Sequence, residues 1–249
     1  MKISPPLDAD PALALRVREE LGLDALATSE AGKRLADVAA AAFSAAPHLL
    51  RLARRRPETL AAILQKGPAE TLESVLTQAC GAAHAADVET LERELRLAKA
   101  DLHLTVGLGD LAGLFDLDAT TGALTTFADA AVQSSLAALA RFEGIAPDAE
   151  RGPAPGFFLL AMGKMGAYEL NYSSDIDLVA FFDAAVLNGG EREAQKIATR
   201  LAQGLMRVLE TRTEHGYVFR TDLRLRPDPG ATPPAVSTDA AESYYESYG

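Results

Sequence analysis

Residues 162–183 read MGKMGAYELNYSSDIDLVAFFD, a glycine-rich turn joined to a short apolar run. A glycine-rich turn precedes two aspartates, Asp175 and Asp177, which are separated by one residue. The run IDLVAFF (176–182) follows and has the length and composition of a buried strand. Because strand side chains alternate between two faces, both aspartates are expected to point the same way. Paired carboxylates repel unless a cation lies between them, so the pair predicts a Mg²⁺ site.

A later segment, GYVFRTDLRLRP (216–227), repeats the alternation and predicts another strand. One face of this strand is apolar, and the other carries Asp222 among Arg220, Arg224 and Arg226. Asp222 is therefore a candidate third metal ligand. The arginines are candidates for holding phosphate oxygens through forked hydrogen bonds.

The turn between the first two predicted strands offers further phosphate-binding groups. Gly163 lacks a Cβ and lets a phosphate approach the backbone closely. Lys164 adds a positive charge, and Ser173 and Ser174 are suited either to phosphate oxygens or to capping the turn.

Each of these features also has an ordinary structural explanation. An isolated Asp-x-Asp is common on exposed turns, and a row of arginines is commonly the solvated face of a strand. The Gly-Lys-Met-Gly turn lacks the spacing and the final Ser or Thr of a P-loop. The combination favours a catalytic site: strand, Gly-Lys turn, paired aspartates, helix, then a strand with a third aspartate.

Composition narrows the possible functions. The chain has 249 residues, 48% of them apolar, and a formal net charge of −11. Such acidity disfavours nucleic-acid binding through bulk electrostatics. A single cysteine predicts no disulfide framework and a reducing compartment, the cytoplasm. The N-terminal segment lacks the apolar core of a signal peptide, and no apolar run of membrane-spanning length occurs.

The pattern predicts an α+β fold with a helical region at 1–145 and a small mixed sheet flanked by helices at 146–249. Asp10 is a predicted N-cap with Pro11 at the first helical position, and Pro47 and Pro57 are expected to begin helices. Residues 143–156 are rich in proline and glycine and predict a long loop.

Two segments of the second region complete the predicted arrangement. FFLLAM (157–162) predicts a strand, and 189–213 predicts an amphipathic helix. The final DAAESYYESYG ends within a helix-like pattern, so we expect the second domain to be truncated at its C-terminal end.

The strings GKMGAYELNYSSDIDLVAFF and GYVFRTDLRLRP resemble the glutamine synthetase adenylyltransferases, members of the DNA polymerase β-like nucleotidyltransferase superfamily. The resemblance extends over the whole chain, including the helical region. It implies that Asp175, Asp177 and Asp222 are catalytic and bind metal, Mg²⁺ or alternatively Mn²⁺. It also implies a role in regulating nitrogen assimilation.

Family members carry two catalytic halves, one removing AMP from glutamine synthetase with phosphate to release ADP, the other adding AMP from ATP. The position of the motif and the string ELNYSSDIDL resemble the AMP-removing half. The expected partners are glutamine synthetase and phosphate with ADP, and a PII-type signal protein is a further candidate. Two alternatives stay open: adenylyl transfer from ATP, and a catalytically silent module that binds a nucleotide or a regulator.

Overall fold

The computed structural model describes residues 9–187 and 190–248. Its contacts group into two compact units. The first contains the chain up to Gln78 together with Leu97–Phe127, and the second contains Ala79–Arg96 and the chain from Ala128 onward. These units differ from a division at residue 145, because three helices each contribute residues to both.

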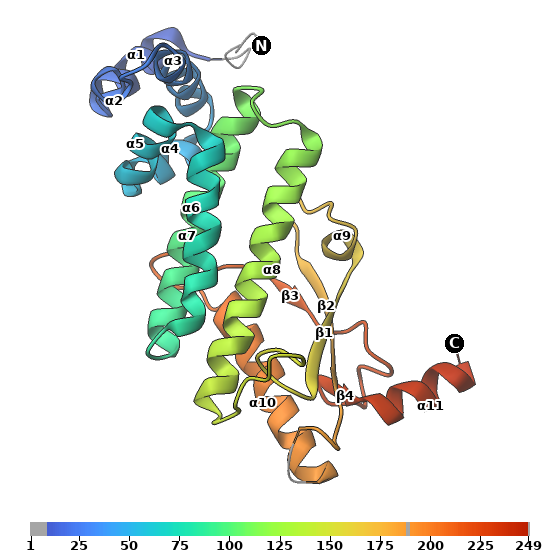
Figure 1. Ribbon diagram of the computed structural model, residues 1–249. Helices are drawn as coiled ribbons and strands as arrows, with labels where there is room; N and C mark the ends of the chain where they lie inside the picture. The colour runs from blue at the N-terminus through green and yellow to red at the C-terminus, as the bar shows by residue number, and fades with distance from the viewer. Residues whose placement is uncertain (1–8, 188–189, 249) are drawn as a thin grey trace. The chain divides into compact units, whose positions relative to one another are not determined.

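Helices account for most of the described residues (Figure 1). They are α1 (Pro11–Glu20), α2 (Leu23–Leu26), α3 (Glu30–Ala45), α4 (Pro47–Arg55), α5 (Pro57–Lys66), α6 (Pro68–Gly81), α7 (Val88–Leu111), α8 (Leu117–Phe142), α9 (Gly163–Gly166), α10 (Glu191–Glu210) and α11 (Thr238–Tyr248), with a 3₁₀ turn at Ala82–His84. Among the described residues, no helix has the length and low polarity that crossing a membrane requires.

Local signals set the helix starts that the sequence predicted. Asp10 caps α1, and its carboxylate accepts hydrogen bonds from the backbone N–H groups of Ala12 and Leu13 at 2.9 and 3.1 Å. Such a cap satisfies N–H groups that have no partner within the helix. Pro47 and Pro57 begin α4 and α5, as expected for a residue whose fixed φ suits the first helical turn.

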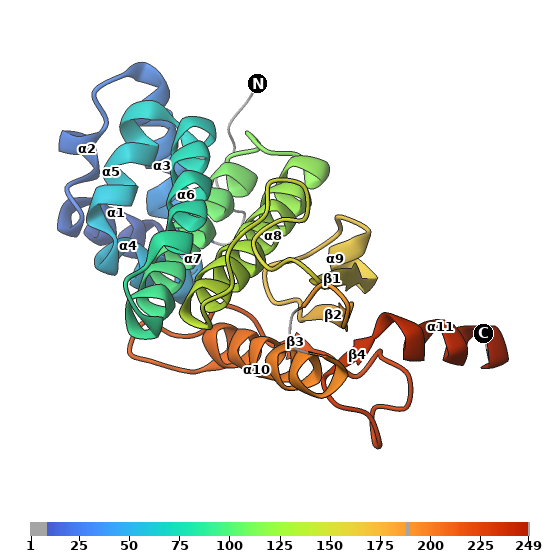
Figure 2. The ribbon, with the colours of Figure 1, turned by 60° about the horizontal axis from the view of Figure 1, so that its bottom comes forward.

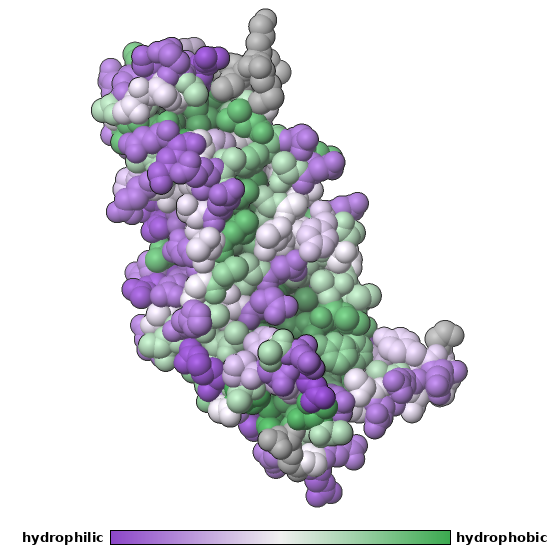
Figure 3. All heavy atoms as spheres, in the orientation of Figure 1, coloured by the Kyte–Doolittle hydropathy of each residue, from purple (hydrophilic) through white to green (hydrophobic). Residues whose placement is uncertain are grey.

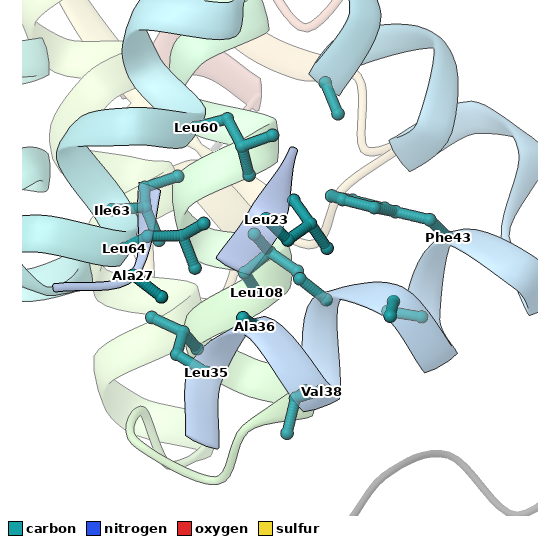
Figure 4. Packing of buried hydrophobic residues seen from close by; sticks show 14 of the residues in the cluster. Leu23, Ala27, Leu35, Ala36, Val38, Phe43, Leu60, Ile63, Leu64 and Leu108 are labelled. Carbon is teal, nitrogen blue, oxygen red and sulfur yellow. The ribbon is translucent and has the colours of Figure 1, made fainter. Parts of the chain in front are cut away.

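The core of the first unit is built from α3, α5 and their neighbours. In Figure 4, side chains from α3 and α5 converge around Leu23, which is fully buried. The alanines of α3 permit close helix packing, and a Cβ at Gly32 would collide with the backbone oxygen of Leu64. This unit is therefore held by close packing of small and large apolar side chains.

The second unit contains a small mixed sheet, which confirms the α+β class. Its strands are β1 (Phe157–Met162), β2 (Ile176–Phe182), β3 (Thr221–Asp222) and β4 (Ala235–Ser237). β1 pairs antiparallel with β2, and both β3 and β4 pair parallel with β2 at different points along it. The first two strands have the predicted bounds.

The prediction of a strand over 216–227 was wrong in extent, since only Thr221 and Asp222 join the sheet. The preceding backbone is bonded elsewhere: the N–H groups of Val218 and Phe219 both donate to the carbonyl of Leu209, at 2.8 and 3.0 Å. Alternating side chains show that a segment can be a strand, but they do not show how many of its residues meet a partner.

Helix α10 covers one face of the sheet, and Figure 2 shows it running beside β3 and β4. Its apolar side was predicted from the sequence, and Leu201, Leu205, Val208 and Leu209 are buried there. Burial of these side chains holds α10 against the sheet. The chain leaves the end of α10 at Glu210 and returns to the sheet at β3.

Candidate functional site

Asp177 and Asp222 lie side by side on adjacent strands. They are paired residues in the parallel register between β2 and β3. Residues opposite each other on neighbouring strands point to the same face of a sheet, so the two carboxylates share one face. The Asp222 side chain is 25% exposed, so the pair is accessible to a ligand from solvent.

Asp175 does not lie on β2 but directly precedes it, and its carboxylate accepts a hydrogen bond from Nε of Arg220. Nη2 of the same guanidinium donates to the carbonyl oxygen of Ser173 at 3.0 Å. The hydrogen bond to Asp175 is the main cause that raises the pKa of Arg220. Arg220 was predicted to share a strand face with Asp222, but it precedes β3 and links this strand to the loop before β2.

Arg224 forms a fork with Asp222. Its Nη2 donates to Oδ2 at 2.6 Å, and its Nε donates to Oδ1 at 3.0 Å. Its backbone N–H also donates to Oδ1, at 2.8 Å. The side-chain hydrogen bonds first, and the backbone bond second, lower the pKa of Asp222 below its ordinary value. Arg224 is 82% exposed, so its guanidinium can reach a bound anion without losing buried contacts.

Arg226 has a different environment from the other two arginines. Nη1 donates to the carbonyl of Leu223 at 2.6 Å, and Nη2 donates to the carbonyls of Pro229 and Thr232 at 2.9 and 3.0 Å. These bonds close the proline-rich loop after β3. Arg226 therefore holds backbone in this structure, and the predicted phosphate contact remains a prediction.

The turn between β1 and β2 approaches the Asp177 carboxylate closely. Gly163 has a φ of +53°, and a Cβ at this position would collide with Oδ2 of Asp177. Gly166 is equally confined, because a Cβ there would collide with the carbonyl oxygen of Ala161. Lys164, between them, is exposed. Glycine is thus required at position 163 for both conformation and space.

The two serines take part in closing the loop. The backbone N–H of Asn171 donates to Oγ of Ser174 at 3.1 Å, and the N–H of Ser173 donates to Oδ1 of Asn171 at the same distance. These bonds agree with the turn-capping alternative. Ser173 remains exposed at the mouth of the site.

Two further residues near this site have roles that the sequence did not predict. Tyr168 has a φ of +60° and donates its hydroxyl hydrogen bond to Asp129 on α8 at 3.0 Å. Glu210, the last residue of α10, accepts a 2.7 Å hydrogen bond from the backbone N–H of Thr221 and so orders the start of β3. Positive φ at a tyrosine leaves no trace in sequence, and the Glu210 bond depends on tertiary structure.

Asp177 and Asp222 are the two carboxylates that the strand register places next to each other. In residues 9–187 and 190–248, no group of three or more acidic, histidine or cysteine side chains is arranged to hold a metal ion. Mg²⁺ commonly takes one or two protein carboxylates and completes its shell with waters and substrate phosphates. Asp177 and Asp222 fit that donor set, and a metal role for Asp175 stays a prediction.

The same face of the sheet is apolar beyond the carboxylates. Met162 is opposite Asp177 in the β1–β2 register, and Leu160 and Phe158 follow along β1 with 47% and 42% exposure. Figure 3 shows hydrophobic side chains gathered over these strands. A groove of about 500 Å³ is lined there by Phe158, Leu160, Phe181, Thr238, Ala241, Glu242, Tyr245 and Glu246.

A family model and several curated proteins that match this chain all point to the same family. A family model described as glutamate-ammonia ligase adenylyltransferase matches residues 33–249. A protein of Caulobacter vibrioides is 47% identical over 96% of this chain and 25% of its own length. Proteins of Mesorhizobium japonicum and Rhizobium meliloti are 43% and 41% identical over 95% and 99% of the chain.

All three relatives are named bifunctional glutamine synthetase adenylyltransferase/adenylyl-removing enzyme. The chain spans about a quarter of the length of these curated relatives.

Proposed function

Because this chain belongs to the glutamate-ammonia ligase adenylyltransferase family, we propose that it removes AMP from adenylylated glutamine synthetase by metal-dependent phosphorolysis. An oxygen of inorganic phosphate attacks the phosphorus of the tyrosyl-AMP ester. The new phosphorus–oxygen bond produces ADP, the bond to the tyrosine oxygen breaks, and the phenolate takes up a proton from water. The register pairing of Asp177 with Asp222 is the observation that supports this proposal most strongly.

The carboxylates have a clear part in this reaction. Asp177 and Asp222 would hold the cation, with Asp175 as the third candidate ligand. A divalent cation supplies charge stabilisation for the entering and leaving oxygens of a phosphoryl group. The carboxylates would fix the position of the cation relative to the sheet, and Gly163, which lacks a Cβ, would leave room for a substrate phosphate beside Asp177.

Arg220 and Arg224 supply the cationic groups that a second phosphate needs. Both guanidinium groups are more than half exposed, at 53% and 82%, and each forms an ion pair with an aspartate of the site. If these aspartates held a cation, Arg220 and Arg224 would be the groups placed to bind the oxygens of the attacking phosphate. Forked donors of this type stabilise charge that develops on such oxygens.

The direction of reaction rests on resemblance more than on geometry. The match of residues 169–178 and 216–227 to the AMP-removing half supports removal. Arginines near the carboxylates would equally serve the β- and γ-phosphates of ATP. Adenylyl transfer from ATP is therefore the second candidate, and the name of the Caulobacter vibrioides relative includes that activity beside AMP removal.

A paired assay tests the proposal. The chain is incubated with adenylylated glutamine synthetase, phosphate and Mg²⁺, and ADP is measured; unmodified glutamine synthetase is incubated in parallel with ATP, and AMP incorporation is measured. We expect ADP release that disappears in Asp177→Asn, and little incorporation from ATP. Efficient incorporation without ADP release would make the chain a transferase, and absence of both activities would indicate a silent module.

A further inference from the structure

The side chain of Arg96 on α7 is buried in the second unit, with only 1% of its surface exposed, and the proposed reaction does not use it. Among the side chains that are fully buried in the described residues, it is the largest. A buried arginine is rare unless its donors are satisfied. The groups that accept hydrogen bonds from Arg96 therefore indicate its structural role.

The guanidinium is bonded almost entirely to backbone carbonyls. Nε donates to the carbonyl of Gly216 at 3.0 Å and to that of Thr211 at 3.2 Å, and Nη2 donates to Thr211 as well. Nη1 donates to the carbonyl of Glu92 at 2.6 Å, and the Glu92 carboxylate lies 3.7 Å from Nη2. Burial lowers the pKa of Arg96, and Glu92 partly opposes that effect.

The two distant carbonyls belong to the turn that leads into the candidate site. Thr211 follows α10 directly, and Gly216 closes the turn by exchanging backbone hydrogen bonds with Thr213 at 2.9 and 3.0 Å. Arg220 is four residues beyond Gly216, and Asp222 is six residues beyond it. Arg96 therefore donates hydrogen bonds to both ends of the turn at 211–216, and this turn precedes Asp222 in the chain.

We propose that Arg96 is a positioning residue that sets the placement of Asp222 against Asp177 by holding the carbonyls of Thr211 and Gly216. The strand that carries Asp222 has only two residues in the sheet, so its own ladder gives it little support. The planar guanidinium satisfies carbonyls in several directions at once, which a lysine ammonium at the same position cannot reproduce. Without it, the carbonyls of Thr211 and Gly216 each lose a donor, and the turn loses its link to α7.

The test compares Arg96→Lys and Arg96→Ala with Arg93→Ala, an exposed arginine on the same helix. The kinetic part rests on the proposed function: kcat and KM for ADP release are measured on the folded fraction. A displacement of the carboxylate on the order of 1 Å predicts a loss in kcat of about 100-fold for Arg96→Ala, with a smaller change in KM. Millimolar guanidinium ion should restore part of the rate in this variant, and Arg93→Ala should match the unchanged chain.

Hydrogen–deuterium exchange provides a readout that needs no activity. If Arg96→Ala does not fold, Arg96→Lys carries the test. We expect faster exchange over 211–222 in Arg96→Lys and unchanged exchange over β1 and β2. Unchanged exchange over 211–222, or a kcat in Arg96→Lys equal to that of the unchanged chain, would overturn the inference. If the unchanged chain releases no ADP, the proposed function fails, and the exchange result still decides the role of Arg96.

Discussion

Replacing Gly163 by alanine tests the geometry of the site directly. The backbone at this position has a φ of +53°, and the added Cβ would collide with Oδ2 of Asp177. Two effects are therefore combined: the cost of a left-handed backbone for an L-residue, and displacement of a carboxylate assigned to the reaction. Gly22 allows the two to be separated, because its φ is +60° and a Cβ there would meet nothing within 4 Å.

The magnitudes of the two effects differ. Left-handed backbone costs an alanine about 1–2 kcal/mol, so both variants should lose a few degrees of thermal stability. Ordinary van der Waals contact begins at 3.4 Å, so the Asp177 carboxylate must retreat by a distance on the order of 1 Å. A misplacement of that size costs about 100-fold in rate, and only Gly163→Ala should show it.

Thermal unfolding and ADP release from adenylylated glutamine synthetase are measured for both variants. We expect similar melting temperatures and a rate that differs by about two orders of magnitude. Full activity in Gly163→Ala would refute the assigned role of Asp177. A rate loss of equal size in Gly22→Ala would show that general destabilisation, and not the carboxylate, explains the effect.

Three other perturbations have defined outcomes. Asp177→Asn should abolish ADP release without lowering the melting temperature, and a clear fall in melting temperature would indicate a structural role instead. Arg56→Met should lower the free energy of unfolding by about 3–5 kcal/mol, because Asp101, 3% exposed, loses its forked partner, whereas exposed Arg55→Met should leave it unchanged in urea titrations. The pKa of His103 is lowered to about 3, chiefly by burial, so stability should be complete above an unfolded pKa of about 6.5 and fall toward pH 3 by at most about 1.4 kcal/mol per pH unit. Urea titrations at several pH values should show a weaker dependence in His103→Gln, and an identical dependence would contradict the assignment.

Local signals made much of the fold predictable. Asp10 with Pro11 marked the start of α1, and the apolar runs at 157–162 and 176–182 became β1 and β2 with unchanged bounds. Each of these depends on a few consecutive residues, through capping, a fixed φ, or burial of a continuous apolar run. Sequence shows such signals directly.

Contacts between distant segments were not predictable in the same way. The alternation at 216–227 gave no sign that only Thr221 and Asp222 would meet β2, or that Arg220 would turn to Asp175. Two partners of Arg96, the carbonyls of Thr211 and Gly216, are separated from it by 115 and 120 residues. Such contacts depend on how the helices and strands pack together, and a single sequence does not show which distant segments will meet.

The most direct test of the account follows the phosphorus atom of inorganic phosphate. Adenylylated glutamine synthetase is incubated with the chain, Mg²⁺ and ³²P-labelled phosphate, and the nucleotide products are separated. Phosphorolysis predicts label in the β-phosphate of ADP, in an amount equal to the AMP lost from the protein, and none with Asp177→Asn. Release of unlabelled AMP, or labelled ADP in equal amount from Asp177→Asn, would contradict the account.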